Sequence, residues 1–246
     1  MRPTVITSTD NARVKEVLRL RKSRERRRSG LFIAEGPREV ERARAAGLRI
    51  EATYFAPELL QWDAGEEVSA RVLEKMAYRA EPEGVLAVVA IPQHTVPADA
   101  TLILVAVGIE KPGNLGAMAR TADAAGADAL LVGDANADPW TPNAIRASTG
   151  AVFTLPIVEV GREDVAALAL RKVAAVVGAT TPHSAPDYTQ PTAFLVGSED
   201  AGLDDAWQAL ADERVVIPMK GTAADSLNAS TAAAVLLFEA VRQRGA

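Results

Sequence analysis

Three segments of the sequence combine glycine with polar side chains at positions where a ligand could bind. They span residues 108–116, 195–203 and 217–230, and each follows a stretch apolar enough to form a buried strand. Open α/β sheets bind their ligands beyond the carboxyl ends of the strands. We therefore expect the three segments to be loops that contribute to one binding site.

The first segment superficially resembles a phosphate-binding loop that leads into a helix carrying Arg120. It is not a Walker A motif, because Asn114 stands where that motif requires lysine, and it contains no G-x-G-x-x-G pattern. Asn114 and Arg120 are six residues apart, nearly two helical turns, so we expect them on roughly similar sides of the helix. A plain strand, turn and helix without a ligand is the alternative interpretation.

The second and third segments each have a purely structural alternative as well. Gly197 follows a buried strand, where a missing Cβ permits close approach by a ligand. Glu199 could instead be a carboxylate at the start of a helix. In the third segment, Asp225 or Ser226 is expected to cap the last helix. The small residues in 229–234 would let that helix pack closely on another element.

The spacing of apolar residues predicts helices alternating with strands in the first part of the chain. The expected elements are a helix from Asp10 or Asn11 to about Arg28, a strand at 31–34, a helix from 37 to about 47, a strand at 50–55, a helix within 66–80 and a strand at 85–91. Together they predict a small α/β domain. Two prolines within residues 91–97 break the pattern and indicate an interdomain linker.

From residue 101 onward the predicted elements are longer and more apolar. Expected strands cover 102–107, 129–132, 173–177, 194–196 and 215–217, and expected helices cover 115–125, 164–172 and 226–242. Strands this apolar are buried on both faces, as in a parallel sheet with helices on each side. We therefore expect an α/β protein with two domains, at residues 1–94 and 98–246.

Charge is distributed unevenly along the chain. The net charge is −5, yet residues 1–50 hold 14 Lys and Arg against 6 Asp and Glu. The densest basic stretch contains four arginines, Arg24, Arg26, Arg27 and Arg28. Like charges packed this closely repel each other unless a polyanion neutralises them. We expect a basic arm that binds nucleic acid through these four residues, with a solvated helix face as the alternative.

Composition excludes several other classes of protein. The chain is 48% hydrophobic and 24% charged, typical of a soluble globular protein. It has no cysteine, and its two histidines, His94 and His183, lie far apart in sequence, so we expect neither disulfides nor a metal site. We expect no membrane-spanning segment and no signal peptide, and hence a cytoplasmic protein.

In this order, the three segments resemble the three motifs of the SpoU/TrmH family of RNA ribose 2′-O-methyltransferases, a branch of the SPOUT superfamily. The matching stretches are 114–122, then Gly197-Ser198-Glu199 with Gly202-Leu203, then 217–219 through 226–228; residues 146–151 and 32–36 also fit. One departure occurs in the second motif, which usually continues Glu-Gly-x-Gly. Here it reads Glu199-Asp200-Ala201-Gly202.

The resemblance implies a catalytic domain at residues 98–246 with a parallel sheet and a deep trefoil knot. Residues 1–94 would be a small α/β domain that binds the RNA substrate, with ribosomal RNA expected before transfer RNA. The resemblance also implies a homodimer in which both chains build each active site. Neither a metal nor a membrane is expected.

The resemblance further assigns roles to individual residues, with S-adenosylmethionine as cofactor. Its adenine and ribose would be held by Gly197, Ile217 and Leu227, with Leu195, Met219 and Ser226 as neighbours. Arg120 would activate the ribose hydroxyl, while Asn114, Glu199, Ser226 and Asn228 arrange the site. Because the pKa of arginine lies far above neutral pH, its guanidinium keeps its proton, and a guanidinium that stabilises the forming alkoxide is easier to justify than a general base.

Two further functional classes stay open from the sequence. One is an RNA-binding or ribosome-assembly factor that has this fold but no catalytic turnover. The other is an NAD-dependent dehydrogenase, although the dinucleotide fingerprint that such enzymes carry is absent. Binding of S-adenosylmethionine or of NAD would separate these classes.

Overall fold

The structure is a computed structural model that describes residues 5–223 and 225–245. Two compact units emerge from the pattern of contacts within the chain. The first comprises residues up to Gln93 together with Trp140–Thr154, and the second comprises His94–Pro139 and Leu155–Ala246. The first unit is therefore built from two separate stretches of sequence.

The first unit contains a four-stranded sheet in the order β1-β4-β2-β3. Strand β4 pairs antiparallel with both β1 and β2, and β3 pairs parallel with β2. The strands are β1 (Leu31–Glu35), β2 (Ile50–Phe55), β3 (Glu66–Glu67) and β4 (Val85–Ala90). Its helices are α1 (Ala12–Arg19), α2 (Ser23–Ser29), α3 (Pro37–Ala45) and α4 (Ala70–Met76). Helices α1 and α4 cover one sheet face with a core that includes Val14, Val17, Leu73 and Met76.

The basic segment forms two helices instead of the single helix expected to run to about Arg28. Helix α1 begins as predicted, because the side chain of Asn11 accepts a hydrogen bond from the backbone N–H of Arg13. It ends at Arg19, with Leu20 as its C-cap, and α2 begins at Ser23 after a turn. Arg26 on α2 is only 3% exposed, and its Nη1 donates to the carbonyl of Leu20 at 2.6 Å.

Residues 140–154 pack within the first unit, although they lie in the range expected for the second domain. Helix α6 (Pro142–Ser148) and the 3-10 turn η1 (Ala151–Phe153) form this segment. The ring of Phe32 lies 5.0 Å from that of Trp140 and 5.7 Å from that of Phe153, measured between centroids. Arg42 also donates a hydrogen bond to the carbonyl of Thr149. These ring contacts join residues that are far apart in sequence, so a local sequence pattern could not assign this segment to the first unit.

The second unit contains a seven-stranded parallel sheet in the order β7-β6-β5-β10-β8-β11-β9. Its strands are β5 (Leu102–Val107), β6 (Ala129–Gly133), β7 (Ile157–Val160), β8 (Arg171–Ala175), β9 (Thr181–Pro182), β10 (Thr192–Val196) and β11 (Glu213–Val216). The central strands β5, β6 and β10 are buried along their whole length, as their apolar sequences predict. The parallel sheet expected from the sequence is confirmed.

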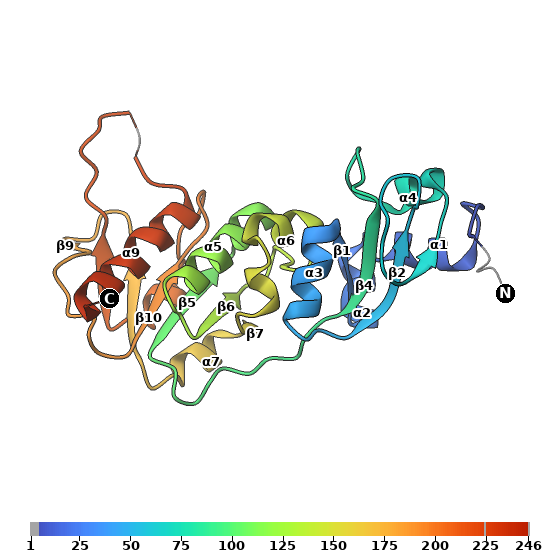
Figure 1. Cartoon of the computed structure of the whole chain (residues 1–246). Helices are drawn as coiled ribbons and strands as arrows, with labels where there is room; N and C mark the ends of the chain where they lie inside the picture. The colour runs from blue at the N-terminus through green and yellow to red at the C-terminus, as the bar shows by residue number, and fades with distance from the viewer. Residues whose placement is uncertain (1–4, 224, 246) are drawn as a thin grey trace. The chain divides into compact units, whose positions relative to one another are not determined.

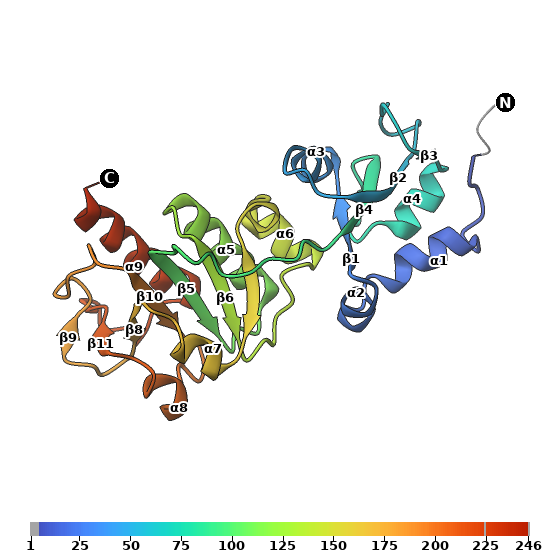
Figure 2. The same cartoon turned by 90° about the horizontal axis from the view of Figure 1, so that it is seen from below.

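Helices cover both faces of this sheet. Helices α5 (Pro112–Ala124) and α9 (Ala229–Arg244) lie side by side on one face, and α7 (Arg162–Ala166) and α8 (Asp205–Gln208) lie on the other (Figures 1 and 2). The helix expected over 164–172 is wrong in length, because it ends at Ala166 and β8 already begins at Arg171. Within the described residues no helix is long and apolar enough to cross a membrane.

Candidate functional site

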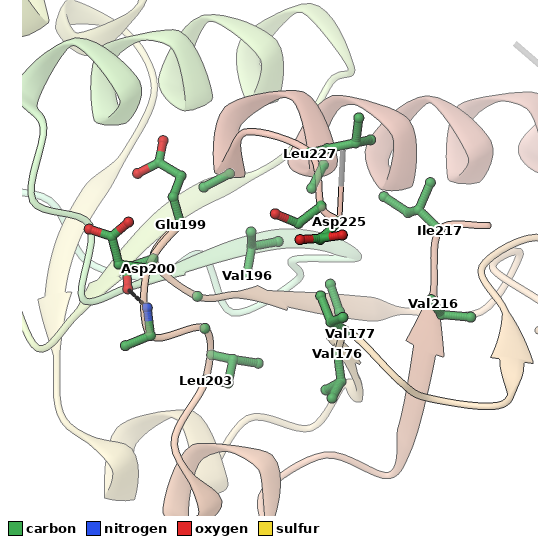
Figure 3. Close-up of a pocket in the computed structure, with 18 of the residues that line it drawn as sticks. Val176, Val177, Val196, Glu199, Asp200, Leu203, Val216, Ile217, Asp225 and Leu227 are labelled. Atoms are coloured by element: carbon green, nitrogen blue, oxygen red, sulfur yellow. Dashed lines mark hydrogen bonds between the residues drawn. The ribbon is translucent and has the colours of Figure 1, made fainter. Parts of the chain in front are cut away.

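A pocket of about 470 Å³ opens at the carboxyl ends of three neighbouring strands of the parallel sheet. Its walls come from the residues after β8, the loop after β10, the segment after β11 and the start of α9 (Figure 3). Apolar walls are provided by side chains that include Val177, Ile217, Met219 and Leu227. The second and third glycine-containing segments therefore meet as predicted, at the place where open α/β sheets bind ligands.

The loop after β10 is shaped by two glycines. A Cβ on Gly197 would lie 2.2 Å from the carbonyl carbon of Gly202, which no other residue could tolerate without backbone movement. Gly202 itself has a φ of +65°, in the left-handed region that glycine adopts without strain. Close approach at Gly197 was predicted, but its partner is the chain's own backbone. The loop is consequently a tight turn that brings its acidic side chains to the pocket.

The C-terminal end of this loop is fixed by contacts to residues that follow β6 and β7. Asp204 caps α8 by accepting from the backbone N–H of Trp207 at 2.8 Å. The buried Trp207 indole donates to Asp134 at 2.5 Å, and Arg162 forms an ion pair with Asp204 at 2.6 Å. These interactions hold α8, and with it the loop that precedes α8, against the ends of β6 and β7.

Three side chains from the three motifs form one hydrogen-bonded cluster beside the pocket. The amide of Asn114 on α5 donates to Oε1 of Glu199. Asn228 donates to the same oxygen at 2.6 Å and to the side-chain oxygen of Asn114 at 3.4 Å. In Figure 3 the Glu199 side chain is directed toward α5. We call Asn114, Glu199 and Asn228 the amide–carboxylate cluster.

Asn228 has a second role as the N-cap of α9. Its side-chain oxygen accepts from the backbone N–H of Ser230 at 3.0 Å. The prediction that Asp225 or Ser226 caps this helix is therefore wrong. Because Asn228 also donates to Glu199, the first turn of α9 and the loop after β10 are fixed by one side chain.

Arg120 is placed apart from the cluster. Its side chain is exposed, it does not line the pocket, and it has no hydrogen bond or ion pair within the described part of the chain. The expectation that it shares a side of α5 with Asn114 is wrong. Six residues at 3.6 per turn leave it about 120° around the helix axis from Asn114.

The structure brings together most residues expected around the cofactor. Gly197, Ile217, Met219, Ser226 and Leu227 line the pocket, but Leu195 does not. Strand alternation explains the exception, since Leu195 is buried in the core on the α7 and α8 face of the sheet. Asp200 and Asp225, which lie within the second and third segments, line the pocket as well, and so does Val177, which the sequence did not indicate. Val177 is 73% exposed, and an exposed valine just beyond a buried strand was the only signal available for it.

The basic residues of the first unit are not equivalent. Arg24, Arg27 and Arg28 are exposed, and Arg28 forms an ion pair with Glu25 at 2.8 Å. For Arg26 the structure corrects the expectation of an RNA contact, because this buried side chain satisfies a carbonyl at the end of α1. Across residues 5–223 and 225–245, no group of three or more potential metal ligands is found.

Family models match both units. The model described as the SpoU rRNA Methylase family matches residues 101–238, and the model described as the MRM3-like substrate binding domain matches residues 11–87. The SpoU match includes all three segments that build the pocket and the amide–carboxylate cluster.

Similar proteins span nearly the whole chain. A 23S rRNA (uridine(2479)-2′-O)-methyltransferase from Streptomyces viridochromogenes is 36% identical, over 95% of this chain and 91% of its own. The 23S rRNA (guanosine(2553)-2′-O)-methyltransferase RlmP from Bacillus subtilis is 31% identical, over 95% and 97%. The crystal structure of the SpoU methyltransferase AviRb from Streptomyces viridochromogenes with AdoMet superposes with a TM-score of 0.83, at 33% identity and over 95% and 98% of the two chains.

Proposed function

The chain belongs to the SpoU rRNA methylase family, and on that premise we propose the reaction, substrate and residues involved. The protein is an S-adenosylmethionine-dependent RNA ribose 2′-O-methyltransferase that acts on ribosomal RNA. The observation that carries this assignment is that the second and third motifs line one pocket, and that Asn114 of the first motif is tied to them through the cluster of Asn114, Glu199 and Asn228. The nucleotide that it methylates is a separate question, because the two relatives differ in their target base.

The pocket suits S-adenosylmethionine in both shape and charge. Its volume of about 470 Å³ lies within the range of about 300–1,000 Å³ that small-molecule sites occupy. Apolar side chains of Ile217, Met219 and Leu227 can enclose an adenine ring. Three carboxylates, those of Glu199, Asp200 and Asp225, also line the pocket and complement a positively charged ligand. Leu195 is left out of the proposed contacts because its side chain belongs to the core.

When bound, S-adenosylmethionine supplies an electrophilic methyl group on a sulfonium centre. The acceptor is a ribose hydroxyl, a weak nucleophile whose oxygen needs stabilisation as it loses its proton. We assign that role to the guanidinium of Arg120, which also suits the adjacent phosphate through its planar pair of donors. Glu199, fixed by Asn114 and Asn228, and Ser226 at the pocket mouth would orient the reacting groups.

Arg120 and the pocket are proposed to meet across a homodimer interface. Arg120 is exposed and does not line the pocket of its own chain, so a second chain is the natural source of this group. Helix α9 supports the same proposal, since it carries the large apolar side chain of Phe238 at 48% exposure. The connections after β10 and β11, which both reach the pocket, are proposed to form the trefoil knot of the family.

The two family-model matches support different roles for the two parts of the chain. Residues 1–94 are proposed to bind the RNA substrate and residues 98–246 to carry out methyl transfer. Arg24, Arg27 and Arg28 are exposed and are proposed to contact phosphates, while Arg26 supports the turn between α1 and α2. We propose the cytoplasm as the place of action, where ribosomal RNA is available.

A methylation assay tests the proposed function. Purified protein is incubated with S-adenosylmethionine carrying a tritiated methyl group and with 23S rRNA, 16S rRNA or bulk tRNA. We expect label in 23S rRNA at one nucleotide, mapped by the resistance of a 2′-O-methylated linkage to alkaline hydrolysis. Label in tRNA alone would support the alternative tRNA enzyme. Failure to bind S-adenosylmethionine, measured by calorimetry with and without RNA, would instead favour a non-catalytic RNA-binding factor.

Subunit complementation tests the shared active site. Arg120→Ala and Asn228→Ala chains are each expected to be nearly inactive as homodimers. Mixing them under conditions that exchange subunits should restore about a quarter of wild-type activity, because half of the dimers are mixed and each has one intact site. Sedimentation of the wild-type protein as a monomer at micromolar concentration would contradict the proposal. A dimer in which mixing restores nothing would place Arg120 and the pocket in the same chain's site.

A further inference from the structure

A second hollow lies wholly within the first unit, away from the pocket of the parallel sheet. Its volume is about 320 Å³, and it is bounded by α1, α2 and the adjoining face of the first sheet. Helices α1 and α2 can be followed beside β1 in Figure 2. Its floor is apolar, formed by Val17, Leu20, Leu31, Ala52 and Val88. We call it the N-terminal hollow.

Three polar side chains that line the N-terminal hollow have no hydrogen bond or ion pair within the described residues. They are the carboxylate of Glu16, the guanidinium of Arg19 and the hydroxyl of Tyr54. Tyr54 is only 4% exposed as a residue, but its hydroxyl is not among the fully buried polar atoms that lack a partner, so the oxygen is accessible from the hollow. These groups are therefore available to a ligand.

The other charged groups around the hollow already have partners. Arg28 pairs with Glu25, Glu51 pairs with Arg49, and Arg13 pairs with Glu66. Burial raises the pKa of the Tyr54 hydroxyl, the carboxylates of Glu66 and Glu16 raise it further, and the guanidinium of Arg13 lowers it. The free groups thus consist of one acceptor, one cation and one hydroxyl around an apolar floor.

We propose that the N-terminal hollow binds an unstacked guanine base of the RNA substrate, a proposal that rests on the proposed function. The apolar floor suits the face of a base, as in single-stranded RNA recognition. A carboxylate acceptor such as Glu16 matches the adjacent N1–H and N2–H donors that guanine presents on its Watson–Crick edge. The Tyr54 hydroxyl can donate to O6 or N7, and Arg19 can contact the neighbouring phosphate.

Guanine is favoured over the other bases by the polarity of these free groups. Adenine and cytosine offer a carboxylate a single amino group, and uracil offers one N–H flanked by two carbonyl oxygens that would repel it. Only guanine places two donors next to each other with an acceptor beside them. The hollow would therefore select a base, whereas Arg24, Arg27 and Arg28 would add affinity without sequence preference.

Fluorescence anisotropy with the full-length protein tests the proposal. The probes are labelled r(UUGUUU), r(UUAUUU) and r(UUUUUU) at low salt. We expect the guanosine probe to bind about tenfold more tightly than the other two, the discrimination typical of a bidentate contact to a base. Glu16→Gln should abolish this preference, and Tyr54→Phe, which removes one hydrogen-bonding group, should weaken guanosine binding roughly fivefold.

Matched controls separate the hollow from general effects on the surface. Glu74→Gln changes an exposed glutamate on α4, and Tyr78→Phe changes an exposed tyrosine, both outside the hollow. Both control proteins should keep the preference for guanosine. Ala52→Leu, which fills the floor without touching a polar group, should weaken binding of the guanosine probe selectively.

Equal affinity for the three probes would overturn the proposal, and so would a guanosine preference that survives in both Glu16→Gln and Tyr54→Phe. Calorimetry with S-adenosylmethionine on the same proteins keeps this outcome separate from the proposed function. If wild-type protein binds the cofactor but shows no guanosine preference, only the hollow is wrong. If it binds no cofactor, the proposed methyltransferase itself is wrong.

Discussion

Asn114 of the amide–carboxylate cluster and Arg120 both lie on helix α5, but they differ in the contacts that hold them. Asn114 is tied to Glu199 and Asn228 by hydrogen bonds within the chain, whereas Arg120 is exposed and has no partner in the described residues. A cluster made before any ligand arrives contributes to stability as well as function. An unpartnered charge contributes little to the fold, so its presence has to be explained by function. The two regions should therefore respond to mutation in opposite ways.

The largest effect on the catalytic rate is expected from substitution of Arg120. If its guanidinium acts in the transition state, Arg120→Ala should lower kcat by about 10²–10³ and leave the affinity for S-adenosylmethionine nearly unchanged. Arg120→Lys keeps the charge but loses the planar donor pair, so it should restore little activity. Single-turnover methylation beside a thermal melt measures both effects, with Arg214→Ala as a control at another exposed arginine. Near-normal turnover by a folded Arg120→Ala protein would remove this residue from the mechanism.

The loop that carries Glu199 should show the opposite behaviour. Gly197→Ala forces backbone movement at Gly202 and should destabilise the protein by about 1–3 kcal/mol, with loss of cofactor binding. Gly113 is a matched control, because an added Cβ there meets nothing within 4 Å. Gly113→Ala lies within α5 and should be neutral or stabilising by up to about 1 kcal/mol. Equal effects of the two substitutions on the melt and on calorimetric binding would contradict the described loop geometry.

The exposed arginines of α2 extend the comparison to the first unit. Changing Arg24, Arg27 and Arg28 to Gln should weaken RNA binding without affecting the cofactor. Each lost phosphate contact should reduce the slope of log affinity against log salt by roughly 0.7–0.9. Arg26→Gln should instead lower the melting temperature, because Arg26 is buried against Leu20. If the slope of log affinity against log salt is unchanged in the triple variant, these side chains are only solvated at the surface and do not contact RNA.

The smallest effect is expected for His94, which makes a hydrogen bond within the chain but lies outside the pocket and the amide–carboxylate cluster. Burial lowers the pKa of His94 from its ordinary value of 6.5, and its Nδ1 accepts from the backbone N–H of Ile157 at 3.2 Å. The unfolded chain therefore takes up a proton more readily than the folded one as the pH falls through 6.5. Stability should be full above that pH and decline toward the lower folded-state pKa. We expect the hydrogen bond of His94 to contribute about 1 kcal/mol to the free energy of unfolding above pH 6.5.

His94→Gln keeps an acceptor that does not titrate. Melting temperatures measured from pH 8 to pH 5 should decline less steeply for this variant than for the wild type, with methylation at pH 8 unchanged. Parallel curves for the two proteins would show that His94 does not contribute to the pH dependence.

Apolar runs predicted the parallel sheet well, because strands such as β5 and β10 are buried on both faces and need continuous hydrophobic sequence. Short elements escaped prediction. Helix α6 and strand β7 were not expected, since each is brief and depends on tertiary partners, β1 for α6 and β6 for β7. The break between α1 and α2 was also missed, because an arginine-rich stretch looks equally helical with or without an intervening turn.

The site was predicted in part for a similar reason. Motif residues such as Glu199 and Asn228 are marked by their spacing, and the structure brings them together. Leu195, which the family resemblance assigned as a neighbour of the cofactor, does not line the pocket, because its side chain lies in the core on the other face of the sheet. Val177 lies in the lining because the carboxyl ends of β8, β10 and β11 meet there, which local sequence does not encode.

The split composition of the first unit has a consequence for how the protein is made. Because Trp140–Thr154 packs with residues up to Gln93, the chain passes between the two units three times. On the ribosome, the first unit stays incomplete until residue 154 has left the exit tunnel, and the rings around Phe32 lack cover until then. Vectorial synthesis therefore interleaves the two units, and no single cut in the chain yields both of them intact.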